Sequence, residues 1–406
     1  MLALFLACFF LLASFASRGA AATYYVKSGD LGGNDGNSGA DWDNAFATFG
    51  HAIQSAVSSG DVVRVAKGTY ETSTGTTGFT VSNSGVSFYG GYPENGGIED
   101  ERDPASNATT LRPAGGTTAR VITINDNTTD ILIDGFVITG GNPPEGNDGG
   151  GIYNKSGASL TVTRSTISEN TVQNKGGTGN GGGICNRGTL ALEACTISGN
   201  RAEQVNASPY GGGICNLGTL TLDGCTLSGN IAERGGGIHV YLGSLTATNC
   251  TFSGNNTDLF GTESHSNDGQ GGGVFNNLLT TSTFLHCTFK GNSGANDGKT
   301  KGIYNRGSVT VKNSIFWGGT GASQLGGAGQ TVSYCVVEGG YDGGTNILTN
   351  DPLLGNLADN GGPTRTCALG AGSPAIDAGT DVGAAATDQR GAARPQPAGG
   401  AYDMGA

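Results

Sequence analysis

The sequence predicts an all-β protein folded as a right-handed, single-stranded parallel β-helix of roughly ten or eleven coils, with an N-terminal capping helix. Three observations lead to this fold class. One motif recurs along most of the chain, apolar and polar residues alternate inside each copy, and 76 of 406 residues are glycine while only 13 % are charged. The glycines show no three-residue period, which excludes collagen, and 36 % hydrophobic residues suffice for a continuous core.

The repeated motif is clearest at four places. GTLALEACTISGN ends at Asn200, GTLTLDGCTLSGN at Asn230, GSLTATNCTFSGN at Asn255 and STFLHCTFKGN at Asn292. Alternation within each copy predicts strands with one buried face, interrupted by a bend just before the Cys. Because equivalent positions recur once per coil, they form columns along the solenoid. The inward column predicted from the Cys position contains Cys195, Cys225, Cys250, Cys287 and Cys335.

Two further columns are predicted to face outward. The first is a rank of hydroxyls formed by Thr166, Thr196, Thr226, Thr251 and Thr288. The second follows the aliphatic residue that opens each repeat, and contains Tyr153, Cys185, Cys215, His239, Phe275 and Tyr304. If the second column faces outward, its rings could stack on sugars, and if it faces inward it is a core ladder; the alternation from Ile152 favours the outward position. Cys185 and Cys215 fall on adjacent coils, where they form either a disulfide or a pair of free thiols.

The segments outside the repeats predict the domain limits. Residues 1–22 have the apolar run and small-residue end of a signal peptide, so we expect an exported protein, secreted or at the cell surface. Residues 23–60 form the N-terminal cap, residues 61–350 the β-helix, and residues 351–406 a segment that closes the other end. Near-helical spacing of apolar residues over 43–58 predicts an amphipathic helix across the N-terminal opening, using Phe46, Phe49, Ile53, Ala56 and Val57.

The net charge and the apolar segments of the chain limit the kinds of partner that we expect. The formal net charge of −12 argues against nucleic acid or an anionic membrane surface as a partner. No second apolar segment follows the signal peptide, so we expect no transmembrane span in the mature chain.

The best candidate for a catalytic site is a charged cluster at the bend before the Cys column. Glu193 and Asp223 are expected on adjacent coils about 4.8 Å apart, with Arg164 beside them on the preceding coil. Two close carboxylates would raise the pKa of one, as a general acid requires, or attract a cation or the guanidinium of Arg164. The alternative is a solvated surface triad with no catalytic role.

A second candidate site is a long loop. Residues 256–270 contain Asp258, Glu263 and Asp268, oxygen donors that could hold Ca²⁺ or contact a glycan. No cofactor motif occurs in the sequence, so Ca²⁺ is the only ion these residues suggest. The alternative is an acidic loop that is exposed to solvent and binds no ligand.

Family resemblance adds to this interpretation. The GGGI and GGGV repeat starts, with ISGN, LSGN, FSGN and FKGN at strand ends, resemble the tandem motifs of chlamydial polymorphic outer membrane proteins. The opening YYVKSGDLGGNDGNSGADWDNAFATFGHAI and the tail NGGPTRTCALGAGSPAIDAG resemble secreted bacterial β-helix proteins with a choice-of-anchor Q domain. These resemblances imply a secreted or surface-exposed β-helix protein, and mostly imply no reaction.

We therefore expect a non-catalytic, adhesin-like protein that binds a polysaccharide or another cell-surface glycan, with Tyr153, His239, Phe275 and Tyr304 as its binding strip. Pectate-lyase-like solenoids also house polysaccharide lyases and glycoside hydrolases, which makes an enzyme acting in a groove the main alternative. The sequence lacks the Arg-x-Pro-x-x-Arg motif of pectate lyases and the Asp-Asp and Gly-His-Gly motifs of polygalacturonases. A structural rod of an envelope or matrix is the third interpretation.

Overall fold

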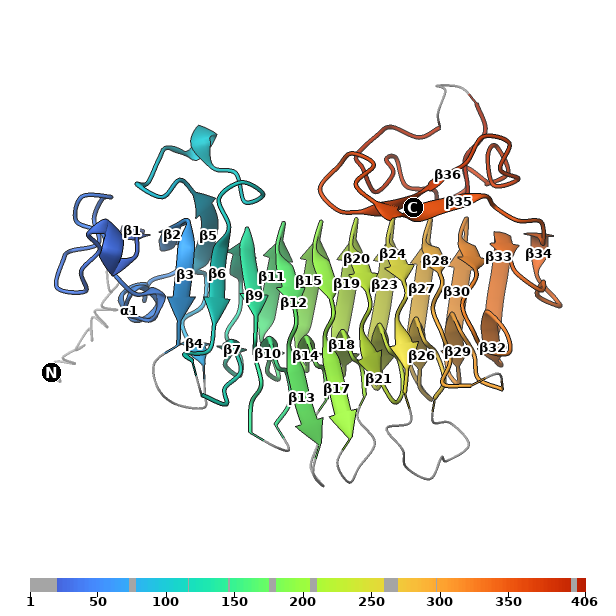
Figure 1. Ribbon diagram of the computed structural model, residues 1–406, viewed down its shortest axis with the longest axis horizontal. Coiled ribbons are helices and arrows are strands. Elements are labelled where there is room, and N and C mark those ends of the chain that lie inside the picture. The colour runs from blue at the N-terminus through green and yellow to red at the C-terminus, as the bar shows by residue number, and fades with distance from the viewer. Residues whose placement is uncertain are drawn as a thin grey trace, which may run out of the picture.

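The computed structural model describes residues 20–72, 78–115, 117–144, 147–174, 180–204, 210–258, 269–296, 298–395 and 400–406. Its body is a right-handed parallel β-helix, as the repeats predict (Figure 1). In the described part of the chain, nine coils carry strands of both rows of sheet A and a strand of sheet B, and partial coils lie at each end.

Sheet A is bent into two rows of strands that share each coil. Its first row contains β1 (Thr23–Val26), β2 (Val62–Ala66), β5 (Ser87–Tyr92), β8 (Ile131–Asp134), β11 (Ser159–Thr163), β15 (Thr189–Glu193), β19 (Thr219–Asp223), β23 (Ser244–Thr248), β27 (Thr281–Leu285), β30 (Ser308–Lys312), β33 (Gln330–Val337) and β34 (Thr345–Leu348). Its second row contains β3 (Gly68–Glu71), β6 (Thr109–Arg112), β9 (Phe136–Thr139), β12 (Thr166–Ser168), β16 (Thr196–Ser198), β20 (Thr226–Ser228), β24 (Thr251–Ser253), β28 (Thr288–Lys290) and β31 (Ile315–Trp317).

The other faces are sheets B and C. Sheet B contains β4 (Phe79–Val81), β7 (Ile122–Ile124), β10 (Ile152–Asn154), β14 (Ile184–Asn186), β18 (Ile214–Asn216), β22 (Ile238–Val240), β26 (Val274–Asn276), β29 (Ile303–Asn305) and β32 (Leu325–Gly327). The shorter sheet C contains β13 (Thr171–Asn174), β17 (Arg201–Gln204), β21 (Ile231–Ala232) and β25 (Asn256–Thr257). Parallel pairing keeps equivalent residues in register, for example Leu190 with Leu220.

The bend between the two rows falls where the sequence predicts it. The residue before the Cys column is left-handed in coil after coil, with φ of 45° at Arg164, 52° at Ala194 and 50° at His286. This single left-handed residue turns the chain between the rows and returns the Cys side chain to the interior. Cys195, Cys225, Cys250, Cys287 and Cys335 are all buried in the main hydrophobic core, which confirms the inward column.

Buried asparagines at the next corner join successive coils by hydrogen bonds. The amide of Asn170 donates to Asn200 Oδ1 at 3.0 Å, and Asn200 to Asn230, Asn230 to Asn255 and Asn255 to Asn292 continue the ladder at 3.0, 2.9 and 3.0 Å. Each amide also donates to a backbone carbonyl, so these polar side chains are satisfied inside the core. The asparagines that end the repeat copies therefore form an internal hydrogen-bond ladder.

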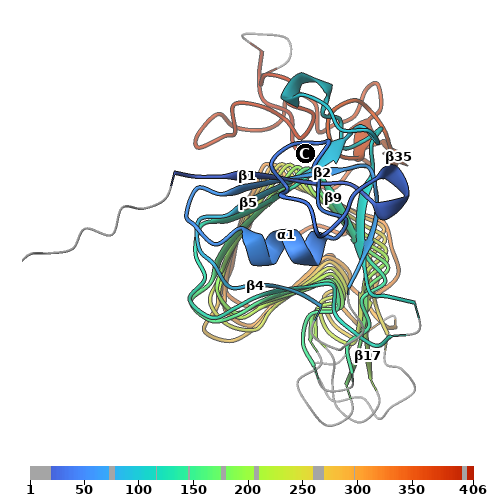
Figure 2. The same ribbon diagram turned by 90° about the vertical axis from the view of Figure 1, so that its left-hand side faces the viewer.

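The N-terminal opening is covered by α1 (Phe49–Ser55), which Figure 2 shows lying within the outline of the coils. Thr48 caps the helix by accepting from His51 N at 3.2 Å, so the helix starts later than the expected residue 43. Phe49 packs edge-on against Phe79 at 5.0 Å. Val57 lies beyond the helix and is 59 % exposed, so its expected place in the apolar face is wrong.

Two irregular arms lie on the outside of sheet A. The first is residues 93–108, which include η2 (Glu99–Glu101), and a second short turn, η1 (Gly29–Leu31), belongs to the N-terminal cap. The second arm is residues 351–406, with the antiparallel pair β35 (Leu354–Ala358) and β36 (Thr366–Leu369). Figure 1 shows both arms above the strands, with a gap between them.

The C-terminal arm was expected to close the end of the solenoid, but it folds back along the side. It is held there by outward hydroxyls: Thr226 Oγ1 donates to Arg365 O at 2.6 Å, and Ala406 N donates to Thr288 Oγ1 at 3.0 Å. Near the last coil, Tyr341 and Ile347 pack against the main core instead.

No helix within the described residues is long and apolar enough to cross a membrane.

Candidate functional site

The candidate site is a groove on the outside of sheet A, between the two arms. Its floor is the second row of strands, where Val137, Thr166, Thr196, Ser198, Thr226 and Ser228 face outward. Residues 102–105 line one side, and residues 362–365 line the other. Two hollows of about 400 and 500 Å³ share Ala105, Thr166, Thr196 and Pro363, and we call their union the lateral groove.

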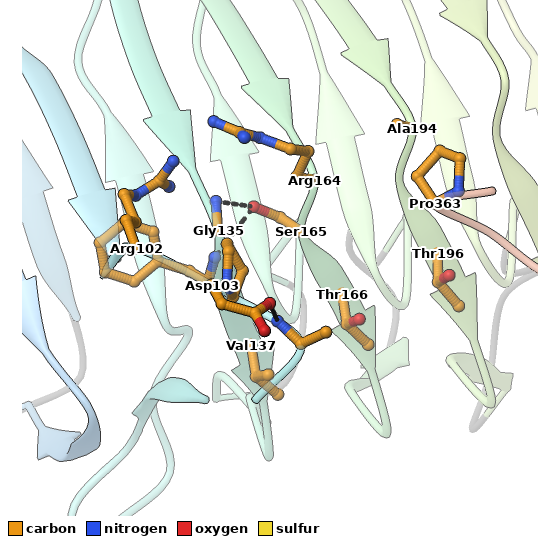
Figure 3. Close-up of a pocket in the computed structure, with 13 residues that line it drawn as sticks. Arg102, Asp103, Gly135, Val137, Arg164, Ser165, Thr166, Ala194, Thr196 and Pro363 are labelled. Carbon is orange, nitrogen blue, oxygen red and sulfur yellow. Dashed lines mark hydrogen bonds between the residues drawn. The ribbon is translucent and has the colours of Figure 1, made fainter. Parts of the chain in front are cut away.

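The groove floor is a regular array of hydroxyls. Parallel register places Thr166 beside Thr196 and Ser168 beside Ser198, and continues with Thr226 beside Thr196. Neighbouring strands are about 4.8 Å apart, so the hydroxyls repeat at that spacing along the groove. Figure 3 shows Thr166 and Thr196 on successive strands, with Arg102 and Asp103 on one side and Pro363 on the other. The predicted outward rank of threonines is confirmed: Thr166, Thr196 and Thr226 line the groove, while Thr251 and Thr288 contact the C-terminal arm.

One end of the groove contains a buried ion cluster that the sequence did not suggest. The Asp134 carboxylate forms ion pairs with Arg102 Nη2 at 2.8 Å and with Arg164 Nη2 at 2.6 Å. The side chains of Asp134 and Arg102 are 7 % and 2 % exposed, whereas that of Arg164 is 52 % exposed. Burial disfavours the Asp134 carboxylate, but the bonds from Arg164 and Arg102 outweigh it and lower its pKa. Both carboxylate oxygens are therefore committed to guanidinium groups.

Arg102 is oriented by its surroundings. Its Nε donates to Gly90 O at 2.7 Å, and its guanidinium lies 5.3 Å from the centre of the Tyr89 ring. It thereby anchors the 93–108 arm to β5 and β8, and so forms one side of the groove. The repeat pattern gives no signal for Arg102 because it lies in an insertion, whereas Asp134 could have been found in the same column as Glu193.

The structure separates the charged cluster expected from the sequence. Glu193 and Asp223 are in register on β15 and β19, as predicted. Arg164 turns instead toward Asp134 on the preceding coil, where its Nη2 donates to Asp134 Oδ2 at 2.6 Å. Hydrogen bonding to Asp134 raises the pKa of Arg164. The pKa of Asp223 is raised, chiefly by burial, while a hydrogen bond from Asn249 opposes the shift.

The predicted aromatic strip lies on the outer side of sheet B but is largely covered. His239 and Phe275 are 1 % and 0 % exposed, and only Tyr153 and Tyr304 are partly accessible. Tyr210 covers His239 with ring centres 4.6 Å apart. The side chains of His239 and Phe275 are therefore not available to stack on a sugar. Burial holds the pKa of His239 well below its usual range.

The remaining predicted residues do not form a site in the described structure. Cys185 and Cys215 are in-register neighbours on β14 and β18, and both are buried free thiols whose pKa is raised by burial. Asp258 is half-buried, while Glu263 and Asp268 lie outside the described residues. Among the described residues, no group of three or more His, Cys, Asp or Glu side chains is arranged to hold a metal ion.

Fold and groove together define a class of protein: a parallel β-helix with an outer groove bounded by two non-repetitive arms. Residues 31–219 match the family described as "Protein of unknown function (DUF1565)". That match covers the N-terminal cap from residue 31 onward, the first arm and the coils that carry Asp134 and Arg164.

One solved structure agrees with the fold, and a second is less similar. A pectate lyase, Pel9A, aligns over 95 % of this chain and 96 % of its own, with a TM-score of 0.52 and 13 % identity. A rhamnogalacturonan lyase aligns over 82 % of this chain and 85 % of its own, with a TM-score of 0.35 and 14 % identity. No curated protein sequence matches the chain. At these identities the likeness to Pel9A establishes the shared fold alone.

Proposed function

We propose that the protein binds a polysaccharide chain in the lateral groove without cleaving it. The observation that carries this proposal is the floor of evenly spaced hydroxyls from Thr166, Thr196 and Ser198, open between two arms. Hydroxyl groups both donate and accept, which suits the hydroxyls of a sugar chain. An elongated polymer also matches a groove that crosses several coils better than a small molecule does.

The groove chemistry favours binding over catalysis. A polysaccharide lyase needs a base that is neutral at working pH, but the pKa of Arg164 is raised, so its guanidinium stays charged. A glycoside hydrolase needs a protonated acid, but Asp134 is held ionised by two arginines. Asp103, on the wall, accepts from Ser106 Oγ at 2.6 Å and from Ala105 N at 3.0 Å, which lowers its pKa as well.

Charged side chains of both signs line the groove. The half-exposed Arg164 lies at one end, and the exposed Arg365 lines the other side. Asp103 and Asp359 line the same groove, and Asp134 neutralises one of the two arginines that it contacts. Because the positive and negative groups balance, we expect acidic and neutral glycans to bind with similar affinity.

The test is affinity electrophoresis or calorimetric titration with acidic and neutral polysaccharides. We expect the double substitution Thr166→Val and Thr196→Val to weaken binding about ten-fold, because it removes two hydroxyls and little volume. Thr221→Val is the matched control, since Thr221 is an exposed strand residue in the first row of sheet A, outside the groove lining. Equal binding by the double variant and the control would reject the groove as the site.

An enzyme is a second candidate because two exposed carboxylates, Glu193 and Asp223, are in register on adjacent coils. Paired carboxylates are the groups that glycoside hydrolases use, and the raised pKa of Asp223 agrees with the acid of such a pair. Release of reducing ends or of unsaturated products from a polysaccharide panel, abolished by Asp223→Asn but not by Asp126→Asn, would establish it. Asp126 is a suitable control because its side chain is 58 % exposed and lies on another corner.

We also propose that the protein is exported and acts in the secreted or surface-bound state. The apolar run of residues 2–15 followed by small residues supports a signal peptide. N-terminal sequencing of the protein from its native host tests this: a mature chain that begins near Thr23 supports export, and an intact N-terminus contradicts it.

A further inference from the structure

Two neighbouring turns project leucine side chains into solvent at the corner between sheets B and A. The usual turn at this corner has two residues, as in Arg187-Gly188, Leu217-Gly218 and Arg306-Gly307. After β22 the turn is Tyr241-Leu242-Gly243, and after β26 it is residues 277–280, which include Leu278 and Leu279. The added residues are therefore mainly leucines, on adjacent coils.

These side chains are unusually exposed. Tyr241, Leu242, Leu278 and Leu279 are 38 %, 49 %, 51 % and 96 % exposed, and they are four of the nine large hydrophobic side chains exposed in the described chain. Leu279 also adopts φ of 62°, a left-handed conformation that bulky residues rarely take. Both the exposure and the backbone strain disfavour this arrangement in a free turn, so folding alone does not explain it. We call these four residues the apolar ridge.

The apolar ridge has a firm base. Tyr241 stacks on Tyr210 with ring centres 5.8 Å apart and planes at 22°, and its carbonyl accepts from Asn277 Nδ2 at 3.4 Å. The two turns are thus joined to each other and to the covered outer face of sheet B. Because the ridge projects from the surface, a partner that contacts it has to offer an apolar surface or interior.

The charged residues around the apolar ridge indicate what kind of partner it contacts. Along this corner, from the turn after β10 to the turn after β29, the sequence places Lys155, Arg187 and Arg306 and no acidic residue, although the whole chain carries −12. Arg187 is neutralised by Asp148 at 2.7 Å, and Lys155 lies 3.9 Å from Asp126. Arg306, on the coil next to Leu279, has no side-chain partner among the described residues. Acidic residues elsewhere are screened beyond about 8 Å at physiological salt.

We propose that the apolar ridge inserts into the surface of a lipid bilayer, with Arg306 contacting the phosphate groups of acidic lipids. Leucine and tyrosine beside arginine is the combination that peripheral proteins use at the boundary between headgroups and acyl chains. The ridge lies on a different corner from the lateral groove, so membrane contact leaves the groove open. This proposal is independent of glycan binding.

The test is co-sedimentation of the full chain with phosphatidylcholine vesicles that do or do not contain phosphatidylserine. We expect wild-type protein to sediment with the acidic vesicles, and Leu278→Ser with Leu279→Ser to lower the partition coefficient at least ten-fold. Arg306→Gln should lower it about five-fold on acidic vesicles and little on neutral ones. Leu353→Ser is the matched control, because Leu353 is 46 % exposed with φ of 52° but lies on the C-terminal arm.

Three results would overturn the proposal. Wild-type protein could fail to sediment with either vesicle, or the double leucine variant could sediment as well as wild type. Light scattering could instead show a dimer that the double variant converts to a monomer, which would make the apolar ridge an interface between copies. Circular dichroism of each variant checks that the β-helix remains folded.

Discussion

At the scale of single residues, Asp134 joins the two arginines at one end of the lateral groove. It neutralises Arg102, whose side chain is almost fully buried, and orients Arg164, whose side chain is half-exposed. Replacing the carboxylate would leave the Arg102 charge buried without a counter-ion. Loss of one partner from a buried ion pair is strongly destabilising, even where the intact pair contributes little net stability.

We therefore expect Asp134→Asn to lower the free energy of unfolding by about 3–5 kcal/mol, measured by urea denaturation. Glu71→Gln, which breaks the exposed Arg112 pair at 2.7 Å, should cost at most about 1 kcal/mol. Because the pKa of Asp134 is lowered in the folded state, its contribution is present above its ordinary pKa near 4 and disappears as the pH falls further. Equal costs for the two substitutions would contradict this account of the buried cluster.

His286 makes the contact between the C-terminal arm and the coils sensitive to pH. It is fully buried, its Nε2 lies 3.1 Å from Asn313 Nδ2, and Asn313 in turn donates to Thr380 O at 2.8 Å. Burial lowers the pKa of His286 to about 3, with Arg394 and Lys312 adding repulsion and the Asp403 and Gly405 backbones opposing it. The docked arm is thus favoured while His286 is neutral.

The lowered pKa of His286 sets the direction of the pH dependence. A depressed histidine pKa gives stability that is present above about pH 6.5 and is lost as the pH falls toward 3. At pH 5 the docked arm should be weakened by about 2 kcal/mol, seen as faster trypsin cleavage at the exposed Arg390 after the rate is corrected for trypsin's own pH dependence. His286→Asn should remove that acceleration, since Asn249 and Asn313 already occupy the same left-handed column. Acceleration that persists in the variant would assign the effect to another group.

At the scale of elements, the C-terminal arm and the lateral groove use the same rank of threonines. Thr166 and Thr196 lie on the groove floor, whereas Thr251 Oγ1 donates to Gln389 Oε1 at 2.6 Å beneath the arm. Gln389 is 3 % exposed and also donates to Thr226 Oγ1 at 2.9 Å. The arm therefore occupies the direction in which the groove would otherwise continue.

Loosening the arm should lengthen the groove. We expect Gln389→Ala to increase affinity for long oligosaccharides about three-fold while leaving short ones unchanged, because two to three further coils become accessible at about 4.8 Å each. Titration with a size series measures this, and Gln54→Ala, at the distant N-terminal cap, serves as the control. A uniform loss of affinity at every length would show that the arm completes the groove rather than limits it.

The difference between the repeated coils and the non-repeated arms explains which elements the sequence could predict. Strands, bend and inward columns follow from positions that recur in every coil, such as Cys195 and Asn200, so each copy reinforces the others. The two arms do not repeat, and their partners lie far along the chain: Arg102 contacts Asp134, and Gln389 contacts Thr226 163 residues away. No local pattern encodes such contacts. The predicted aromatic strip was misleading for the same reason, because Tyr210, which lies outside the repeat pattern, covers His239.

At the scale of the whole molecule, the β-helix is a stack in which each coil contacts mainly its two neighbours. Stability of such a solenoid is approximately a sum of coil and neighbour terms, so a whole coil can be removed if the columns stay in register. Asn170 and Asn200 are equivalent positions, as are Asn200 and Asn230. Deleting residues 171–200 would join Asn170 to Arg201 and bring Ile167 beside Leu227.

We expect this coil deletion to fold cooperatively, with a β-rich circular dichroism spectrum, when combined with Asp148→Asn. The second change is needed because the deletion removes Arg187, which neutralises the buried Asp148 at 2.7 Å. The two arms would then approach by one coil, about 4.8 Å, and the lateral groove would lose the Thr196 position. Folding retained with glycan binding lost would mean that the arms and their separation create the site on an interchangeable stack. A chain that fails to fold would mean instead that the coils are not independent units, and that the groove cannot be separated from the stability of the solenoid.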